Sequence, residues 1–233
     1  MAIIDAISKA ILRVQSGQPV QEVYSSTEQI CIEMADLANE VASEIMRSQD
    51  WRNLTKLHTI TGDGVQTDFS LPPDFDRMVL ASYLQDDQNW FWGYRNIDTV
   101  NEWLQWKQSG FWGVLPGGWI MIGGGMSFVP PPSGSATYPY ISNLYAKDAD
   151  GVPKDHFSSD TDTFVLDDHL ITLGCIWRWR QQKGMDYSED LQSYENDLSQ
   201  SQARDKGARV IRSGSMSRLP NARLAYPWPL GGI

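Results

Sequence analysis

Residues 25–54, SSTEQICIEMADLANEVASEIMRSQDWRNL, carry a strong helical pattern and decide how the first part of the chain folds. Apolar side chains recur there at the spacing of one helix face, and the set is Ile30, Met34, Leu37, Ala38, Val41, Ala42 and Ile45. We expect a helix over 26–48 that opens with a capping box between Ser25 and Glu28. Because polar residues occupy the remaining positions, this helix should pack along one stripe.

Three further segments show the same periodicity, at 2–14, 167–183 and 187–208. Asp167 or Asp168 can cap the second of them, and Gly184 is placed to end it. Asp186 and Glu189 form a cap signature for the third, so the last two helices should form a helical hairpin.

The region between the helices has strand-like patterns. Two short runs flank Gly62-Asp63-Gly64, which predicts a β-hairpin, and residues 77–84 indicate a buried strand. Two more strands are expected at 118–122 and 126–129, with a glycine turn between them.

These patterns together predict an α+β fold. We expect a helical bundle body from 1–84 and 165–211, made of the N-terminal long helix and the C-terminal helical hairpin. An irregular, Trp-rich β insertion should occupy 85–164, and an extended arm 212–233. Six of the ten tryptophans lie close together and should form the core of the insertion: Trp90, Trp92, Trp103, Trp106, Trp112 and Trp119.

Charge is distributed unevenly along the chain. The formal net charge is -10, yet residues 203–233 hold six basic groups and one acid, so residues 1–202 carry -15. An acidic body should repel DNA at close range, whereas a basic tail could meet nucleic acid or an acidic protein.

The terminal segment combines this basic charge with apolar residues. Its arginines include Arg212, Arg218 and Arg223, a residue type favoured for fixed pairing with carboxylates. Its end alternates large apolar side chains with small residues or proline, in the order Leu224, Tyr226, Trp228 and Leu230. We expect an arm that docks in extended form on an acidic protein, with DNA as the second choice and a solvated tail without a partner as the third.

The sequence offers no pattern for catalysis, cofactor binding or metal binding. His58, His156 and His169 lack metal-ligand spacing, and Gly123-Gly124-Gly125 lacks the Lys-Ser/Thr of a phosphate loop. The two cysteines, Cys31 and Cys175, fit buried free thiols in a reducing compartment. We expect neither a transmembrane helix nor a secretory signal.

The order of elements resembles that of the head-to-tail adaptor proteins of tailed bacteriophages, particularly the tail-tube-type connectors of short-tailed phages. In those proteins a helix ends near an Asp-Trp element, a strand leads into an LP-x-DF-x-R turn, and a helical bundle ends in a C-terminal extension. The matching residues here are Asp50, Trp51, Leu71, Pro72, Asp74, Phe75 and Arg77. The likeness covers about 25–84, and 165–211 by helical pattern alone.

The resemblance implies a non-enzymatic virion protein of the neck, assembled in the host cytoplasm. It implies a cyclic homo-oligomer of twelve subunits beneath the portal protein, whose C-terminal extension contacts the portal. Tail or nozzle proteins would lie on the other side. The genome would pass through the lumen without specific binding.

Two other functions remain open from the residues alone. Exposed tryptophans of the insertion could bind cell-wall carbohydrate in a tail component that binds or degrades the wall. Alternatively, the basic arm could bind DNA ends during packaging.

Overall fold

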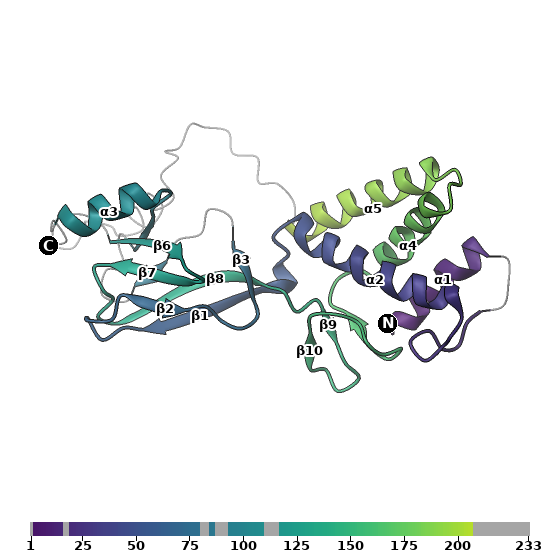
Figure 1. Ribbon diagram of the computed structural model, residues 1–233, viewed down its shortest axis with the longest axis horizontal. Coiled ribbons are helices and arrows are strands. Elements are labelled where there is room, and N and C mark those ends of the chain that lie inside the picture. The colour runs from purple at the N-terminus through teal and green to yellow at the C-terminus, as the bar shows by residue number, and fades with distance from the viewer. Residues whose placement is uncertain (1, 16–18, 80–83, 87–92, 110–116, 207–233) are drawn as a thin grey trace, which may run out of the picture. The chain divides into compact units, whose positions relative to one another are not determined.

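The computed structural model describes residues 2–15, 19–79, 84–86, 93–109 and 117–206 (Figure 1). Its helices are α1 (Ile3–Val14), α2 (Gln29–Ser48), the short 3-10 helix η1 (Arg52–Leu54), α3 (Val100–Ser109), α4 (Asp168–Gln182) and α5 (Ser188–Lys206). Its strands are β1 (Thr55–Thr61), β2 (Asp68–Ser70), β3 (Phe75–Met78), β4 (Gln85–Asp86), β5 (Arg95–Asn96), β6 (Gly118–Ile122), β7 (Gly125–Val129), β8 (Ser135–Ser142), β9 (Ala146–Lys147), β10 (Pro153–Lys154) and β11 (Thr163–Phe164). The combination of helices and sheets confirms the expected α+β class.

The described residues fall into two compact units. One contains those of Met1–Thr55 and Ile141–Arg209, and the other those of Lys56–Tyr140. Side chains of β1, β2 and β3 share a core with those of β6, β7 and β8, which accounts for this grouping. The domain limits that we expected at 84/85 and 164/165 stay a prediction.

Helix α4 is the centre of the helical unit and packs against α1, α2 and α5 (Figure 1). Its residues Leu170–Ile176 are buried without interruption, so it lacks the polar face of a surface helix. The buried Thr172 hydroxyl donates a hydrogen bond of 3.1 Å to the carbonyl oxygen of Ala6 in α1. Buried aliphatic residues of α1 and α2 supply the rest of this core, among them Ile3, Ile7, Met34, Leu37 and Ile45.

Gly174 allows α2 and α4 to approach closely. A Cβ atom on this residue would lie 2.4 Å from Cγ1 of Val41, well inside van der Waals contact. Glycine at this position is therefore required by the close packing of the two helices and not by an unusual backbone angle.

The predicted caps are confirmed for α4 but not for α2. Asp167 caps α4 through a 2.9 Å bond from the His169 N–H, and Gly184 follows the helix with a φ of 68°, both as expected. The capping box of α2 is wrong: the helix begins at Gln29, and Glu28 at its N-cap accepts no side-chain cap bond. The Ser25 hydroxyl donates instead to Glu22, 2.7 Å away, in the preceding segment.

The second unit consists of two sheets around a common aromatic core. One sheet has the order β1-β8-β3 with β4 also paired to β8, and the other has the order β2-β7-β6-β5. An isolated bridge between Leu84 and Tyr94 links the two. The buried core residues are Ile60, Leu84, Tyr94, Trp119, Met126, Phe128, Ala136, Tyr138 and Tyr140.

The expected hairpin at Gly62-Asp63-Gly64 is wrong. The strands on either side of this turn belong to different sheets, with β1 beside β8 and β2 beside β7. Gly62 and Gly64 donate their N–H groups to the carbonyl oxygens of Gly134 and Pro132, at 2.9 and 2.8 Å. A local turn signal cannot distinguish a hairpin from a crossing between sheets, because the partner strand is distant in sequence.

Of the other strand predictions, one is confirmed and one is met only in part. Strands β6 and β7 pair antiparallel around Gly123-Gly124, as expected. The strand expected over 77–84 is present only as β3, whose residues are half-buried, and residues 80–83 lie outside the described part.

The insertion is less irregular than expected, since it contains α3, which the sequence analysis did not predict. Trp103 and Trp119 are buried there, and Trp106 packs against a small cluster with Ile97 and Ile120. Trp90, Trp92 and Trp112 lie outside the described residues. Among the described residues, tyrosine and phenylalanine contribute more of the larger core than tryptophan does.

Both cysteines are buried and free, as the sequence predicted. Burial raises the pKa of the Cys175 thiol to about 12. Among the described helices, none has the length and apolar character needed to cross a lipid bilayer.

The contact between Gly174 and Val41 can be tested by substitution. Gly174→Ala should destabilise the protein by about 1–3 kcal/mol, because the valine is β-branched and cannot rotate away easily. In a Val41→Ala background the same change should become neutral or stabilising by up to ~1 kcal/mol, since alanine favours helices. Urea unfolding of the four proteins measures both values, and equal effects in the two backgrounds would contradict the close contact.

Candidate assembly interface

The Asp50-Trp51 element terminates α2. Trp51 is buried, and its indole Nε1 donates a 2.7 Å hydrogen bond to the carbonyl oxygen of Ile45 in the last turn of the helix. The next residue, Arg52, donates its backbone N–H to the carboxylate of Asp205 near the end of α5, at 3.2 and 3.3 Å. This element therefore joins the C-terminal ends of α2 and α5.

The second half of the motif forms a turn that is tied into the aromatic core. The Phe75 N–H donates to the carbonyl oxygen of Pro72 at 3.0 Å, which closes the turn. Asp74 accepts hydrogen bonds from the Tyr140 hydroxyl at 2.9 Å and from Lys56 Nζ at 2.6 Å. The Phe75 ring stacks on Tyr140 with 5.7 Å between centroids, and Leu71 packs beside them.

Electrostatics at this turn follow from burial. Burial, aided by the hydrogen bond to Asp74, raises the pKa of Tyr140 to about 12, so its hydroxyl remains a donor at neutral pH. Arg77 donates to the neighbouring carboxylate of Asp76 at 2.6 Å. The contacts described for these motif residues close turns, fill the cores and hold the strands in position.

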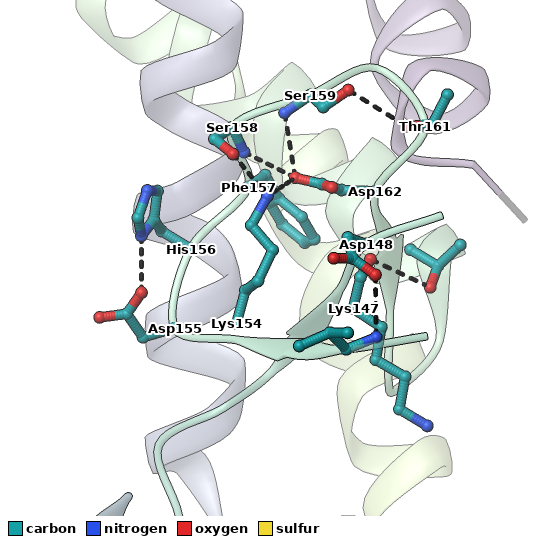
Figure 2. Close-up of polar contacts among 12 residues, drawn as sticks. Lys147, Asp148, Lys154, Asp155, His156, Phe157, Ser158, Ser159, Thr161 and Asp162 are labelled. Atoms are coloured by element: carbon teal, nitrogen blue, oxygen red, sulfur yellow. Dashed lines mark hydrogen bonds and ion pairs between the residues drawn. The ribbon is translucent and has the colours of Figure 1, made fainter. Parts of the chain in front are cut away.

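A polar centre that the sequence analysis missed lies in the loop after β10 (Figure 2). The Asp162 side chain is buried, and its Oδ2 accepts bonds from Lys154 Nζ at 2.7 Å and from the N–H groups of Ser158 and Ser159 at 2.7 and 3.0 Å. Burial opposes ionisation of this carboxyl, but Lys154 and the two N–H groups outweigh it and lower its pKa. We call Lys154–Asp162 the aspartate loop.

The aspartate loop holds the N-terminal part of the helical unit in place. The carbonyl oxygen of Asp162 accepts the N–H of Ile3 at 2.7 Å, and Asp160 Oδ1 accepts the N–H groups of Val23 and Tyr24 at 3.0 and 3.2 Å. Asn39 of α2 pairs with both backbone groups of Phe157, at 2.7 and 3.2 Å. The loop thus attaches α1, the segment before α2 and α2 itself to one polar centre.

The outer face of α2 is acidic. Asp36, Glu40 and Glu44 are exposed along it. Arg178 of α4 forms ion pairs with Glu40 and Glu44, and Lys183 pairs with Glu33 at 2.9 Å. The two basic groups that meet this face are thus already paired with its carboxylates.

The residues that we expected to bind the portal lie outside the described part of the chain: Arg212, Arg218, Arg223, Leu224, Tyr226, Trp228 and Leu230. Within the described ranges, no group of three or more His, Cys, Asp or Glu side chains is arranged to hold a metal ion.

The motif residues make contacts that close turns and fill the cores of the two units. In a comparison with known families, the model of the SU10 adaptor protein family matches residues 1–223. The chain belongs to this family and is a head-to-tail adaptor of a tailed bacteriophage, a virion component of the neck that joins portal and tail components. No curated protein matches the sequence.

The aspartate loop gives a testable stability effect. Asp162→Asn keeps the shape of the side chain but removes the charge that Lys154 pairs with, and it should destabilise the protein by about 3 kcal/mol at pH 7. Asp155→Asn is the matched control, because Asp155 is exposed and its carboxylate pairs with the exposed side chain of its neighbour His156. Chemical unfolding of both variants measures the difference.

The same pair predicts a pH dependence. The pKa of Asp162 is lower in the folded than in the unfolded protein, so its stabilisation is complete above about pH 4 and is lost as the pH falls through the folded-state pKa. The gap between wild type and Asp162→Asn should therefore shrink on acidification. A gap that stays constant down to pH 2 would contradict the ion pair.

Proposed function

We propose that this adaptor forms a cyclic ring of twelve subunits between portal and tail, and that the genome passes through its lumen. The observation that carries the proposal is the family match over 1–223, which includes both the helical unit and most of the basic arm. We assign the ring to the neck of a short-tailed phage, assembled in the host cytoplasm, with no enzymatic activity.

The charge distribution supports this role. Residues 1–202 carry a net charge of -15, and the outer face of α2 is acidic. A channel lined by such a surface repels the phosphate backbone, so DNA can slide without binding. Specific DNA recognition would need unpaired basic groups facing the lumen.

The arm is the proposed contact with the portal. Arg212, Arg218 and Arg223 can pair with carboxylates on the portal, and Leu224, Tyr226, Trp228 and Leu230 provide apolar anchors. Ordering such an arm on the portal costs conformational entropy, which the contacts with the portal must offset. Because of this cost, we expect the free protein to be monomeric and the ring to form on the portal. Tail or nozzle proteins would contact the rest of the ring.

Carbohydrate binding through the tryptophans is less well supported. Trp103 and Trp119 are buried in the β unit and cannot stack on a sugar. Saturable binding to cell-wall polysaccharide, lost in Trp90→Ala or Trp112→Ala, would favour this alternative.

Deletion of residues 212–233 should abolish portal binding and leave the body folded. Mass photometry of the intact chain with portal rings should show about twelve added copies, whereas the deletion variant should add none. A circular dichroism spectrum and unfolding midpoint equal to those of the intact body would exclude misfolding. A deletion variant that binds the portal at full strength would refute the assignment of the arm, and an intact chain that never associates would refute the ring itself.

A further inference from the structure

Strand β1 lies at the edge of its sheet, with β8 as its only neighbour among the described strands. Two contacts fix the register of this pair. The Gly62 N–H donates to the Gly134 carbonyl oxygen at 2.9 Å, and the hydroxyls of Thr59 and Thr137 lie 2.8 Å apart. Residue 62 therefore lies opposite 134, and residue 59 lies opposite 137. Because the numbers increase along one strand and decrease along the other, β1 and β8 are antiparallel.

This register determines which backbone groups of β1 are open. In an antiparallel ladder, hydrogen-bonded pairs alternate with non-bonded pairs. Since Gly62 is in a bonded pair, residues 56, 58 and 60 also direct their N–H and C=O groups to β8. The backbone groups of Leu57, Thr59 and Thr61 consequently point to the edge that no described strand occupies.

The side chains of these three residues share one face of the sheet. All are exposed, and Leu57 has 73% of its surface accessible, which is unusual for a leucine on a strand. Lys56 does not guard this edge, because its ammonium group reaches Asp74 on the opposite face. Exposed edges are normally blocked by charges, proline or short length. β1 has seven residues and shows none of these.

The end of the arm has the pattern that such an edge accepts. In Leu224-Ala-Tyr-Pro-Trp-Pro-Leu230, prolines occupy 227 and 229, so from Tyr226 onward an extended segment can donate N–H groups only from 226, 228 and 230. Positions 224, 226, 228 and 230 carry Leu, Tyr, Trp and Leu on one face. The other edge is blocked by proline, so the segment can complete a sheet but cannot extend it.

We propose that, in the free protein, residues 224–230 bind the open edge of β1 of the same chain as an additional strand. The N–H groups of Tyr226 and Trp228 meet the backbone of β1, where Leu57, Thr59 and Thr61 repeat with the same two-residue period. The Tyr and Trp side chains then lie on the face that carries Leu57 and cover it.

The arm is long enough to reach this edge. It continues from α5, whose Asp205 binds the N–H of Arg52, three residues before β1 begins. The 18 residues from Lys206 to Leu224 span up to about 60 Å when extended. Tethering makes the local concentration of the segment of millimolar order, so even a weak strand contact would be occupied.

This strand site does not depend on portal binding, although it would hold the arm in the free protein before the portal binds. The aromatic residues would be covered in the monomer, and the portal would have to displace them from β1. Its test therefore uses the isolated adaptor, so that failure here leaves the portal assignment untouched.

Amide hydrogen exchange measured by NMR gives a direct test on the intact chain and on a 1–223 truncation. The amides of Leu57, Thr59 and Thr61 should exchange at least ~10-fold more slowly in the intact chain. The amides of His58 and Ile60 are the internal control, because they face β8 and should be protected in both proteins. Equal exchange of the three open amides in the two proteins would overturn the proposal.

Proline substitutions in the arm provide a matched pair. Tyr226→Pro removes an N–H that must face β1 and should abolish the protection. Ala225→Pro removes an N–H that faces away and should preserve it. Loss of protection in both variants, or in neither, would refute the strand geometry, and protection that disappears on dilution would assign the segment to a second copy and refute the intramolecular contact.

Discussion

The close approach of α2 and α4 at Gly174 is the constraint on which the helical unit depends. Because Val41 occupies the space that a side chain at 174 would need, the two helices pack closely along this contact. Helix α4 is also packed against α1 and α5, which explains why Leu170–Ile176 are buried without interruption. The contact also joins distant parts of the sequence, since α2 precedes the β unit and α4 follows it. The complete helical unit therefore needs both the segment before the β unit and the segment after it.

The two compact units are stabilised by different chemistry. Aliphatic side chains dominate the helical core, and a polar centre around Asp162 holds the loops and α1 against it. Aromatic rings dominate the β unit, where Asp74 ties the turn before β3 to Lys56 and Tyr140. The residues on which the resemblance to adaptor proteins rests are divided between the two units: Asp50 and Trp51 end α2, whereas Leu71–Arg77 form a turn and strand in the β unit. These residues thus meet two separate packing requirements, one in each unit.

Local signals in the sequence were sufficient for most helices, and they failed where distant residues decide the structure. Apolar periodicity, Asp167 and Gly184 are properties of a few adjacent positions, so α1, α2, α4 and α5 were predictable. The pairing of β1 with β8 depends on residues some 75 positions apart, and the Gly62-Asp63-Gly64 turn looks the same with either partner. Helix α3 was missed because its periodic pattern is weak and the region around it is rich in glycine and tryptophan. The role of Asp162 could not be predicted, because nothing local indicates that this one carboxylate among many is buried against a lysine.

The two buried cysteines have a practical consequence for following assembly. Cys31 and Cys175 are the only cysteines of the chain, and neither is accessible to solvent. The raised pKa of Cys175 further suppresses its thiolate, the form that reacts with maleimides and other alkylating agents. The folded native protein should therefore not react with such reagents. A single cysteine introduced at the surface would carry a fluorophore at one known position, without any need to remove the natural thiols and disturb the core that they fill.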